Sequence, residues 1–338
     1  MSLKISIVIP SFNQGKYIEE TILSVLNQKD PNLELIVIDG NSTDNSVEII
    51  RKYESALKYW ISESDSGQSD AINKGYSIAS GEIITWLGSD DLLLPGSLAR
   101  VRMEFESAPS DVGVIFGQSD LFRDGITLNI EYGSRIQNVE RRLAGMAFPQ
   151  PSSFTLKKFV DQVGIVNPEL HFGMDYELFA RLALVCDFKR VDYCFSRYRI
   201  HDESKSGAGF IDFSEEWIKV FNSIAVGLKL ESTLKEMAEL DLITDLIPAT
   251  RDFFDSHRPR ISIDEKMLSF FFISNVFFHM YLTGRFKKAK NVADYLNCHY
   301  REQMQLIPDI NLIFKRSLKY PPAFLGFARS LKQYLTGR

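Results

Sequence analysis

The chain has 338 residues, of which 45% are hydrophobic and 25% charged, and it carries a net charge of -5. At roughly 150 residues per domain, this length allows one large domain or two smaller ones. The composition excludes collagen-like, low-complexity and wholly disordered proteins. The acidic balance argues against a protein that coats nucleic acid, so no nucleic-acid partner is expected. The three cysteines form no CxxC pair, which disfavours a disulfide framework and fits a cytoplasmic protein.

Two hydrophobic periods alternate over the first hundred residues. Continuous apolar runs are typical of strands buried on both faces, and apolar residues at helical spacing lie between these runs. A repeated strand–helix order predicts a mostly parallel sheet with right-handed crossovers. The predicted strands are 5–9, 33–38, 58–62 and 82–87, and the helices between them lie around 18–26, around 47–53 and at about 69–79.

Beyond residue 95 the pattern is less regular. A helix at 96–107, strands near 112–116 and 152–156, a helix at 175–185 and a strand near 188–198 complete a mixed sheet. From about residue 210 the pattern is helical. We therefore predict an α/β fold, with a mixed, mostly parallel sheet flanked by helices in residues 1–207 and a helical C-terminal region in residues 208–338.

The most apolar stretch of the chain, residues 267–282, includes Asn275 and His279. As a helix its sixteen residues would span about 24 Å. A bilayer's hydrocarbon core is about 30 Å thick. The stretch is therefore predicted to be a buried core helix rather than a membrane span.

Carboxylates follow several of the predicted strands at the point where each strand ends. Strand one runs into residues 10–13, strand two into Asp39, strand three into 63–65 and strand four into 89–91. Ligands of open α/β sheets bind outside the carboxyl ends of the strands. Acids gathered there repel one another unless a cation or hydrogen-bond donors compensate. Hard oxygen ligands suit Mg²⁺ or Mn²⁺, which bind through one or two carboxylates and substrate phosphates, so a metal and a phosphorylated substrate are predicted.

Other phosphate-binding motifs are absent from the sequence. The chain has no GxxxxGK[ST] loop, and strand one is not followed by GxGxxG. Ser11 stands where a phosphatase with an aspartyl nucleophile would carry its acid. The P-loop, dinucleotide-binding and aspartyl-phosphatase interpretations are therefore disfavoured.

Several short motifs follow one another along residues 4–207. They are IVIPSFN at 7–13, ELIVIDGNSTD at 34–44, DSGQSDAINKG at 65–75, SDD at 89–91, QPSSF at 150–154, MDYEL at 174–178, and YRIH at 198–201 with SKS at 204–206. In this order they resemble the family 2 glycosyltransferases of GT-A fold. The region after residue 210 shows no pattern that we can assign.

The resemblance implies that a nucleotide sugar, UDP-linked, donates its glycosyl group to an acceptor hydroxyl with inversion at the anomeric carbon. The implied acceptor is a glycan or a lipid-linked glycan of surface polysaccharide or glycolipid synthesis. Pro10 would line the nucleotide pocket, Asp39 would accept a hydrogen bond from the base, and Asp65 with Lys74 would flank the donor. The other implied donor-binding residues are Ser11, Asn13, Gln68, Asp90, His201 and Lys205.

The same resemblance assigns the metal and the base. Asp91, supported by Asp90, would ligate Mn²⁺ or Mg²⁺, which neutralises a departing diphosphate as a Lewis acid. Asp175 opens a predicted helix and is the candidate general base for the acceptor hydroxyl. His201 is a candidate ligand for the metal or the diphosphate. The positive side chains around it are Arg197, Arg199 and Lys205.

This chain departs from the family pattern at two positions. Many relatives have an acid where this chain has Gly88, and many have a glutamate where it has Met174. Two rival functions stay open. A sugar-phosphate nucleotidylyltransferase should show a Gly-rich, basic loop after strand one, which residues 11–16 lack. A non-catalytic nucleotide-sugar-binding module would bind the donor without turnover.

Charge is unevenly distributed along the chain. Residues 285–338 contain eleven Lys or Arg and three Asp or Glu, a net charge of +8, which leaves -13 for the other residues. The basic residues are interleaved with apolar ones, as in 313–320 and 324–332. This pattern suits peripheral contact with an anionic membrane, at the inner face for a cytoplasmic protein, and the alternative is an ordinary solvated helical face.

Overall fold

The computed structural model describes residues 2–205, 210–257, 259–260 and 262–336. The chain divides into two compact units. The first comprises residues 1–137 and 146–208, and the second comprises residues 138–145 and 209–338. Within the described ranges, no helix combines the length and the hydropathy that a membrane crossing requires.

The first unit is built on a nine-stranded sheet. Its strands are β1 (Ile5–Ser11), β2 (Leu33–Asp39), β3 (Tyr59–Ser62), β4 (Ile83–Trp86), β5 (Leu92–Leu93), β6 (Val112–Arg123), β7 (Ile126–Glu131), β8 (Ser153–Leu156) and β9 (Asp187–Arg199). They lie in the order β3-β2-β1-β4-β8-β6-β9-β5, with β7 beside β6. The first four strands pair in parallel, as the alternation of strands and helices predicts, and so do β6 and β9. The other ladders are antiparallel.

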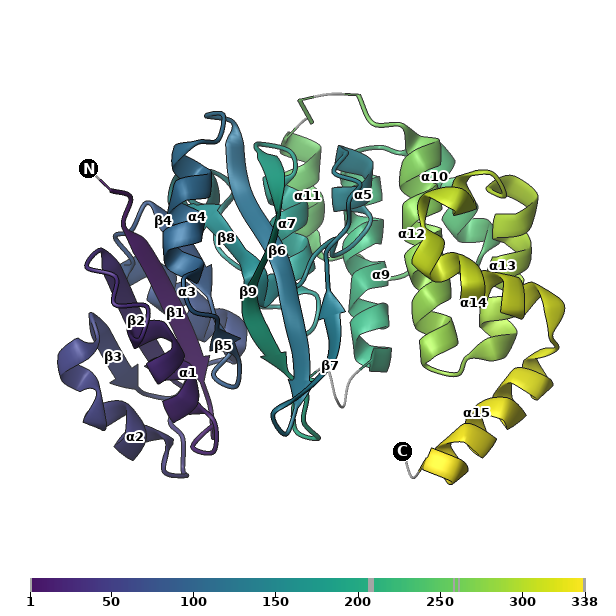
Figure 1. Cartoon of the computed structure of the whole chain (residues 1–338). Coiled ribbons are helices and arrows are strands. Elements are labelled where there is room, and N and C mark those ends of the chain that lie inside the picture. The colour runs from purple at the N-terminus through teal and green to yellow at the C-terminus, as the bar shows by residue number, and fades with distance from the viewer. Residues whose placement is uncertain (1, 206–209, 258, 261, 337–338) are drawn as a thin grey trace. The chain divides into compact units, whose positions relative to one another are not determined.

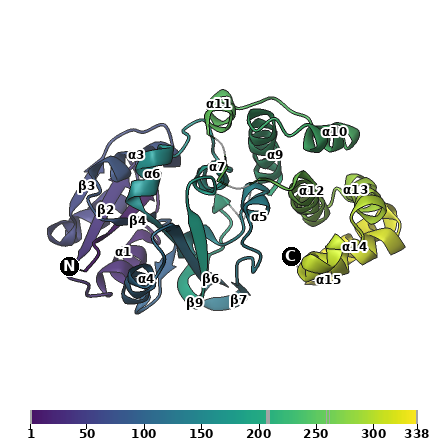
Figure 2. The same cartoon turned by 90° about the horizontal axis from the view of Figure 1, so that it is seen from above.

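Helices cover both faces of this sheet. They are α1 (Ile18–Leu26), α2 (Ser46–Lys52), α3 (Gln68–Ile78), α4 (Ser97–Glu106), α6 (Lys157–Val163) and α7 (Met174–Leu182), with short 3₁₀ turns at Glu54–Ala56 and Gln150–Ser152. Helices α3 and α6 lie on one face of the parallel strands, and α1 and α4 lie on the other (Figures 1 and 2). Gly75 lets α3 approach β1 closely, because a Cβ there would lie 2.3 Å from Cγ1 of Val8.

The β6–β7 hairpin is absent from the sequence prediction. The strand predicted near 112–116 extends to Arg123, and β7 returns beside it. The turn between them is Asp124–Gly125, with φ of 50° and 81°. Two positive φ angles are typical of a tight hairpin turn, and Asp-Gly is a known signal for one. Helix α6 and the short strand β5 are also additions to the prediction.

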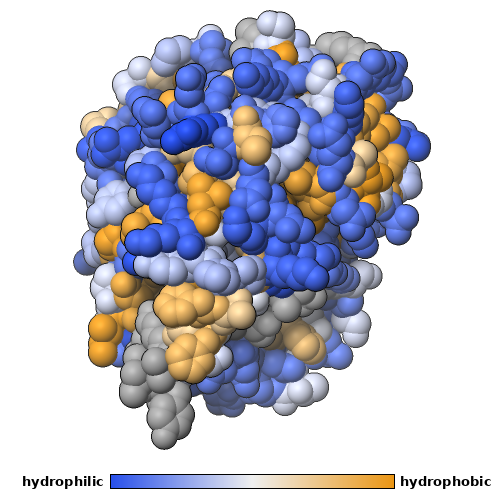
Figure 3. Space-filling model, turned by 90° about the vertical axis from the view of Figure 1, so that its right-hand side faces the viewer, coloured by the Kyte–Doolittle hydropathy of each residue, from blue (hydrophilic) through white to orange (hydrophobic). Residues whose placement is uncertain are grey.

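The second unit is helical, as predicted. Its helices are α5 (Val139–Leu143), α9 (Phe210–Gly227), α10 (Glu231–Glu239), α11 (Pro248–Ser256), α12 (Glu265–Leu282), α13 (Phe286–His299), α14 (Pro308–Lys319) and α15 (Pro322–Thr336), with a 3₁₀ turn at Gln303–Leu306. Helix α12 contains the apolar stretch 267–282 and buries most of it, which confirms the predicted core helix. Its Phe272 stacks on Phe221 of α9, with ring centroids 3.6 Å apart. Exposed side chains of this unit include hydrophobic residues beside hydrophilic ones (Figure 3).

Glu34 is a buried acid that ties β2 to neighbouring segments. It accepts hydrogen bonds from Oγ of Ser6 at 2.7 Å and from the N–H and Oγ of Ser80 at 2.9 and 2.6 Å. Burial alone would raise its pKa, but these hydrogen bonds, with one from Lys4, lower the pKa of Glu34 from 4.5 to about 2. The folded state therefore favours the ionised form. This contribution to stability is present above pH 4.5 and is lost as the pH falls toward about 2.

We accordingly expect Glu34→Gln to weaken the pH dependence of unfolding between about pH 4.5 and 2. Thermal melting of the variant and the wild type across this range measures the effect. Glu54→Gln, at an exposed position, is the matched control and should follow the wild-type curve. A Glu34→Gln curve that runs parallel to the wild type would contradict the expectation.

Candidate active site

The loops after β1 and β2 are tied to each other at the carboxyl end of the sheet. Asn13 has a left-handed conformation with φ of 52°, which asparagine tolerates better than most residues. Its backbone N–H donates to Oγ of Ser42 at 2.7 Å, and its Oδ1 accepts from the N–H of Thr43 at 2.8 Å. The N–H of Gly15 donates to Asp44 at 2.8 Å. Asn13 therefore links the loops that follow β1 and β2.

Ser11 and Asp39 are paired in register at the ends of β1 and β2. Asp39 is fully buried. Its carboxylate accepts hydrogen bonds from the N–H and Oγ of Ser42, at 2.9 and 2.6 Å, and from Oγ of Ser62 at 2.7 Å. Oγ of Ser11 is buried and has no hydrogen-bond partner within the described part of the chain. A buried hydroxyl without a partner costs free energy, so Ser11 is a candidate ligand contact.

Asp65 and Lys74, predicted to flank one ligand together, have different partners in the structure. Asp65 lies against the end of β2, because a Cβ on Gly40 would be 2.8 Å from its Oδ2. Lys74 forms ion pairs with Glu63 at 3.0 Å and Asp70 at 3.5 Å. The hydrogen bond with Glu63 is the main cause that raises the pKa of the Lys74 ammonium. The structure thus pairs Lys74 with acids other than Asp65.

Lys205 reaches the first residue of α3. Its Nζ donates to Oε1 of Gln68 at 2.8 Å and to the backbone carbonyl of His171 at 2.7 Å. It also lies 5.8 Å from the centre of the Phe172 ring. The predicted donor-binding residues Gln68 and Lys205 are therefore in direct contact, although 137 positions separate them in the chain.

The turn after β4 carries the acid pair Asp90–Asp91. Asp91 is buried, and its Oδ1 accepts a hydrogen bond from the backbone N–H of Arg199 at 3.0 Å. Burial, and then repulsion from Asp90, raise the pKa of Asp91 well above its usual range. A Cβ on Gly88 would lie 2.8 Å from Oδ2 of Asp91 and 2.9 Å from Oδ1 of Asp90. A side chain at position 88 would therefore force the acid pair to move, so the departure at Gly88 fits the packing of this turn.

Arg199 and His201 contact the acid pair from the end of β9. Nε of Arg199 donates to the backbone carbonyl of Asp90 at 2.8 Å, and its Nη2 pairs with Glu20 at 2.5 Å. Nε2 of His201 lies 2.9 Å from Oδ2 of Asp90. The Tyr17 ring packs 4.6 Å from the His201 ring and 4.9 Å from the Arg199 guanidinium. The structure thus brings His201 to the acid pair.

Asp175 lies in the first turn of α7, where its Oδ1 accepts from the N–H of the next residue at 2.7 Å. Asp175 and the acid pair both affect the pKa of the Tyr198 phenol on β9. Burial raises the pKa of Tyr198 well above its usual range, and nearby carboxylates raise it further. In order of effect these carboxylates belong to Asp91, Asp90, Glu131 and Asp175. The candidate base and the acid pair therefore both raise the pKa of one phenol.

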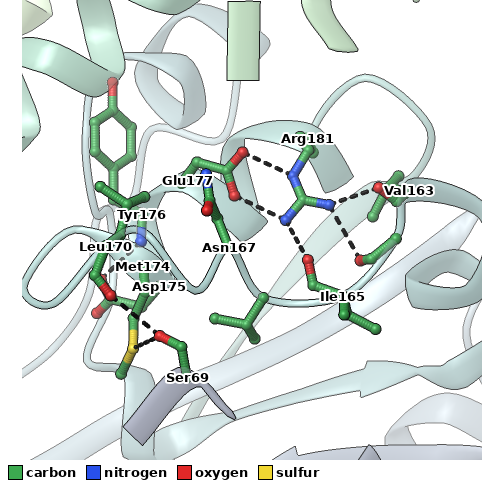
Figure 4. A network of polar contacts seen from close by, with 12 residues as sticks. Ser69, Val163, Ile165, Asn167, Leu170, Met174, Asp175, Tyr176, Glu177 and Arg181 are labelled. Carbon is green, nitrogen blue, oxygen red and sulfur yellow. Dashed lines mark hydrogen bonds and ion pairs between the residues drawn. The ribbon is translucent and has the colours of Figure 1, made fainter. Parts of the chain in front are cut away.

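A buried network holds the helix that carries Asp175 (Figure 4). Arg181 and Glu177, one turn apart on α7, form a bidentate ion pair with N–O distances of 3.0 and 2.7 Å. Both side chains are almost completely buried. The guanidinium also donates to the backbone carbonyls of residues 163–165, at 2.5 to 3.1 Å. Arg181 therefore joins α7 to the loop that follows α6.

The same region is tied to α3. Oγ of Ser69 lies 2.9 Å from Sδ of Met174 and donates to the loop before α7. The amide of Asn73 exchanges two hydrogen bonds with the backbone of Val166, at 2.8 and 3.0 Å. These contacts fix the first turn of α7, and with it Asp175, relative to the helix that begins at Gln68.

We expect Arg181→Ala to lower the free energy of unfolding by about 3–5 kcal/mol, because Glu177 would keep an uncompensated buried charge. Urea denaturation followed by circular dichroism measures this loss. The matched control is Arg100→Ala. Arg100 pairs with Glu104 at 2.7 Å but is 37% exposed, so its loss should cost no more than about 1 kcal/mol. Equal costs for the two variants would contradict a stabilising role of the network.

The acid pair fits a divalent cation. Asp91 is a buried carboxylate beside a second acid, and a cation would offset the charge that burial and repulsion disfavour. Mg²⁺ and Mn²⁺ accept such oxygen ligands and commonly bind one or two carboxylates together with substrate phosphates. In the ranges that the structure describes, no three or more His, Cys, Asp or Glu side chains are arranged as a metal centre. Substrate oxygens would therefore have to complete the shell.

Two further side chains are not part of the predicted site. Phe12 follows β1 and is 59% exposed, which is unusual for a large aromatic residue directly after a buried strand. Glu131 ends β7, and burial raises its pKa above the usual range. Phe12 belongs to the motif at 7–13, and nothing in that motif indicates that its ring is exposed. Glu131 belongs to the hairpin whose only signal was Asp124–Gly125.

Comparison with known proteins finds similarity to glycosyltransferases. A family model for glycosyl transferase family 2 matches residues 6–162. An uncharacterized glycosyltransferase of Mycobacterium tuberculosis is 30% identical over 187 residues, which cover 54% of this chain and 70% of that protein. The GalNAc(5)-diNAcBac-PP-undecaprenol beta-1,3-glucosyltransferase of Campylobacter jejuni is 29% identical over 161 residues, covering 46% of this chain and 47% of that protein.

The chain spans 41% and 38% of the lengths of two further curated glycosyltransferases that match it. Among solved structures, Staphylococcus aureus TarS 1–349 in complex with UDP-GlcNAc matches with a TM-score of 0.57 and 16% identity. The match covers 99% of this chain and 93% of that one. This likeness confirms the predicted GT-A fold.

Proposed function

Because this chain belongs to glycosyl transferase family 2, we propose that it transfers a sugar from a nucleotide-sugar donor to an acceptor hydroxyl, with inversion at the anomeric carbon. One observation carries the proposal. Asp91 is a buried carboxylate beside Asp90 in the turn after β4, and the carboxylate of Asp175 raises the pKa of the same Tyr198 phenol as these two acids do. The pair suits a diphosphate with its cation, and Asp175 suits a base for the acceptor.

UDP is the nucleotide that we propose, since the matched TarS structure holds UDP-GlcNAc. Pro10 and Ser11 lie at the end of β1 and would contact the nucleotide base. The buried Ser11 hydroxyl has no hydrogen-bond partner among the described residues, and the Phe12 ring can stack on the nucleotide base. A carboxylate offers about four acceptor positions. The Ser42 and Ser62 bonds use three positions on Asp39, which leaves one for the base. Asp65, Gln68, Lys74 and Lys205 are the proposed donor contacts further along the edge.

At the diphosphate, Asp91 with support from Asp90 would hold Mn²⁺ or Mg²⁺, and His201 is a further candidate ligand. A bound cation there supplies Lewis-acid neutralisation of the departing diphosphate. The backbone N–H of Arg199 holds the Asp91 carboxylate, and its guanidinium holds the backbone carbonyl of Asp90, so Arg199 fixes the turn that carries both acids. Rigid positioning of this kind lowers the cost of reaching the reactive geometry.

On the acceptor side, Asp175 takes the proton of the attacking hydroxyl. A general base needs hydrogen-bond reach to that proton, and the anchored first turn of α7 holds the carboxylate in place. Many relatives carry a second acid next to the general base. This chain has Met174 at that position, and the Met174 sulfur contacts the Ser69 hydroxyl. Glu131, on β7, is a further carboxylate that raises the pKa of Tyr198.

We propose that the acceptor is a glycan or a lipid-linked glycan of surface polysaccharide or glycolipid synthesis, and that the enzyme works in the cytoplasm, peripherally at the inner membrane face. The name of the C. jejuni relative, a transferase that acts on an undecaprenol-linked glycan, supports a lipid-linked acceptor. The predicted glycosyltransferase domain, residues 1–207, would carry the donor and acceptor sites.

A thermal-shift panel of nucleotide sugars, with and without Mn²⁺, tests the donor. A ligand at 100 times its Kd stabilises the folded state by about 2.7 kcal/mol. We expect UDP-sugars with Mn²⁺ to raise the melting temperature more than GDP- or ADP-sugars do. Sugar phosphates without a nucleotide, which are substrates of a nucleotidylyltransferase, should leave it unchanged, and stabilisation by them would favour that rival.

A further inference from the structure

Helices α14 and α15 present a face that is both basic and apolar. On α14, exposed residues follow one another at i, i+3, i+4 and i+7, the spacing of one helical face. On α15, two phenylalanines one turn apart are 51% and 66% exposed. We call this set the C-terminal face, and it consists of Leu312, Lys315, Arg316, Lys319, Phe324 and Phe327.

The basic and apolar parts of the C-terminal face are continuous. Nζ of Lys319 lies 5.3 Å from the centre of the Tyr320 ring, and that ring stacks on Phe324 at 5.1 Å. The opposite side of α14 is packed, since Phe314 is buried and meets Phe277 of α12 edge-on at 6.1 Å. The exposed residues of α14 therefore lie on a helix whose other side is packed against α12.

Charge identifies the partner that suits this face. Lys315, Arg316 and Lys319 form no ion pair with any described residue, in contrast to Lys290, which pairs with Asp294. They belong to the segment 285–338 with its net charge of +8. Pairing of this face with itself in a symmetric dimer would bring like charges together, whereas an anionic lipid surface offers phosphates to the basic side chains and an apolar boundary to the phenylalanines.

We propose that the C-terminal face docks on anionic phospholipid, with Phe324 and Phe327 among the headgroups and Lys315, Arg316 and Lys319 on the lipid phosphates. The purpose of this docking rests on the proposed function, because an enzyme that acts on a lipid-linked acceptor reaches that acceptor at a bilayer surface. The binding itself depends only on the C-terminal face.

Co-sedimentation of the full chain with vesicles tests the docking. We expect binding to vesicles of phosphatidylglycerol and phosphatidylcholine, none to phosphatidylcholine alone, and release at high salt, where screening shortens the range of charge interactions. Lys315→Ala/Arg316→Ala/Lys319→Ala should lower the partition coefficient by about 100-fold, at roughly fivefold per basic residue. Phe324→Ser/Phe327→Ser should lower it by about tenfold or more, because less apolar area leaves water.

The matched control removes the same charge from other elements, as Lys52→Ala/Lys235→Ala/Lys266→Ala, all at exposed positions. It should bind vesicles as the wild type does. A control that loses as much binding as the α14 variant, or a wild type that binds neither vesicle, would overturn the proposal. So would a dimer in gel filtration that Phe324→Ser/Phe327→Ser dissociates without any vesicle binding.

Nucleotide-sugar affinity, measured by calorimetry on the same variants, separates the two proposals. We expect it to be unchanged in all of them. A wild type that binds vesicles through this face but no nucleotide sugar would refute the proposed function and leave the docking intact. A wild type that binds nucleotide sugar but no anionic vesicle would refute the docking alone.

Discussion

Asp175→Asn will lose about 10²- to 10⁴-fold in turnover, the usual contribution of a general base, while its donor affinity stays that of the wild type. The amide keeps the size of the side chain but cannot take a proton. Because the loss concerns a proton transfer that occurs only during reaction, it should appear in kcat and not in nucleotide binding. UDP release from the donor measures turnover, and calorimetry measures affinity.

The matched control is Asp161→Asn on α6, an acid that is 58% exposed and pairs with Lys157. It should turn over the donor at the wild-type rate. Turnover by Asp175→Asn within a few-fold of the wild type would show that another group, for which Glu131 is a candidate, takes the proton.

Asp91→Asn should abolish the Mn²⁺-dependent part of donor affinity. The neutral amide provides no charge to balance a cation on the diphosphate, so donor affinity with Mn²⁺ should fall to the value measured without it. Calorimetry with a UDP-sugar, with and without Mn²⁺, gives both numbers. Asp124→Asn, in the exposed hairpin turn, is the control. Equal Mn²⁺ dependence in the Asp91→Asn variant and the wild type would remove Asp91 from the metal site.

The same variant should not be less stable than the wild type. Burial and the neighbouring Asp90 raise the pKa of Asp91, so the folded protein disfavours the ionised form. Stability is therefore lost as the pH rises past the usual pKa of an aspartate, and the uncharged amide avoids this loss. A melting temperature at neutral pH that equals or exceeds the wild-type value fits a residue retained for binding. A large decrease would indicate a structural role.

The parallel half of the sheet could be predicted because each of its strands is an apolar run followed by a helical period. The β6–β7 hairpin could not. Strand β7 lies at the edge of the sheet with Ile126 and Leu128 69% and 46% exposed, so its hydrophobic residues mark no buried face. Only the Asp124–Gly125 turn signalled it, and Glu131 remained hidden with it.

The acids at the strand ends could likewise be predicted, since parallel strands end at one edge. Their partners could not, because these come from distant parts of the chain. His201 meets Asp90 across 111 positions, and the Arg181–Glu177 pair reads in the sequence as an ordinary helical i,i+4 pair. The ion pairs of Lys74 with Glu63 and Asp70 could not be predicted either, although its role as a donor contact stays a prediction.

Turnover of a UDP-sugar is the most direct test of the claim that this chain is an active glycosyltransferase. A panel of labelled UDP-sugars is incubated with the full chain and Mn²⁺, with and without an undecaprenol-linked glycan, and released UDP and labelled product are counted. We expect one UDP-sugar to be turned over in a Mn²⁺-dependent reaction that both Asp91→Asn and Asp175→Asn lose. Binding of a UDP-sugar by the wild type without turnover of any donor would contradict catalysis and identify a non-catalytic nucleotide-sugar-binding protein.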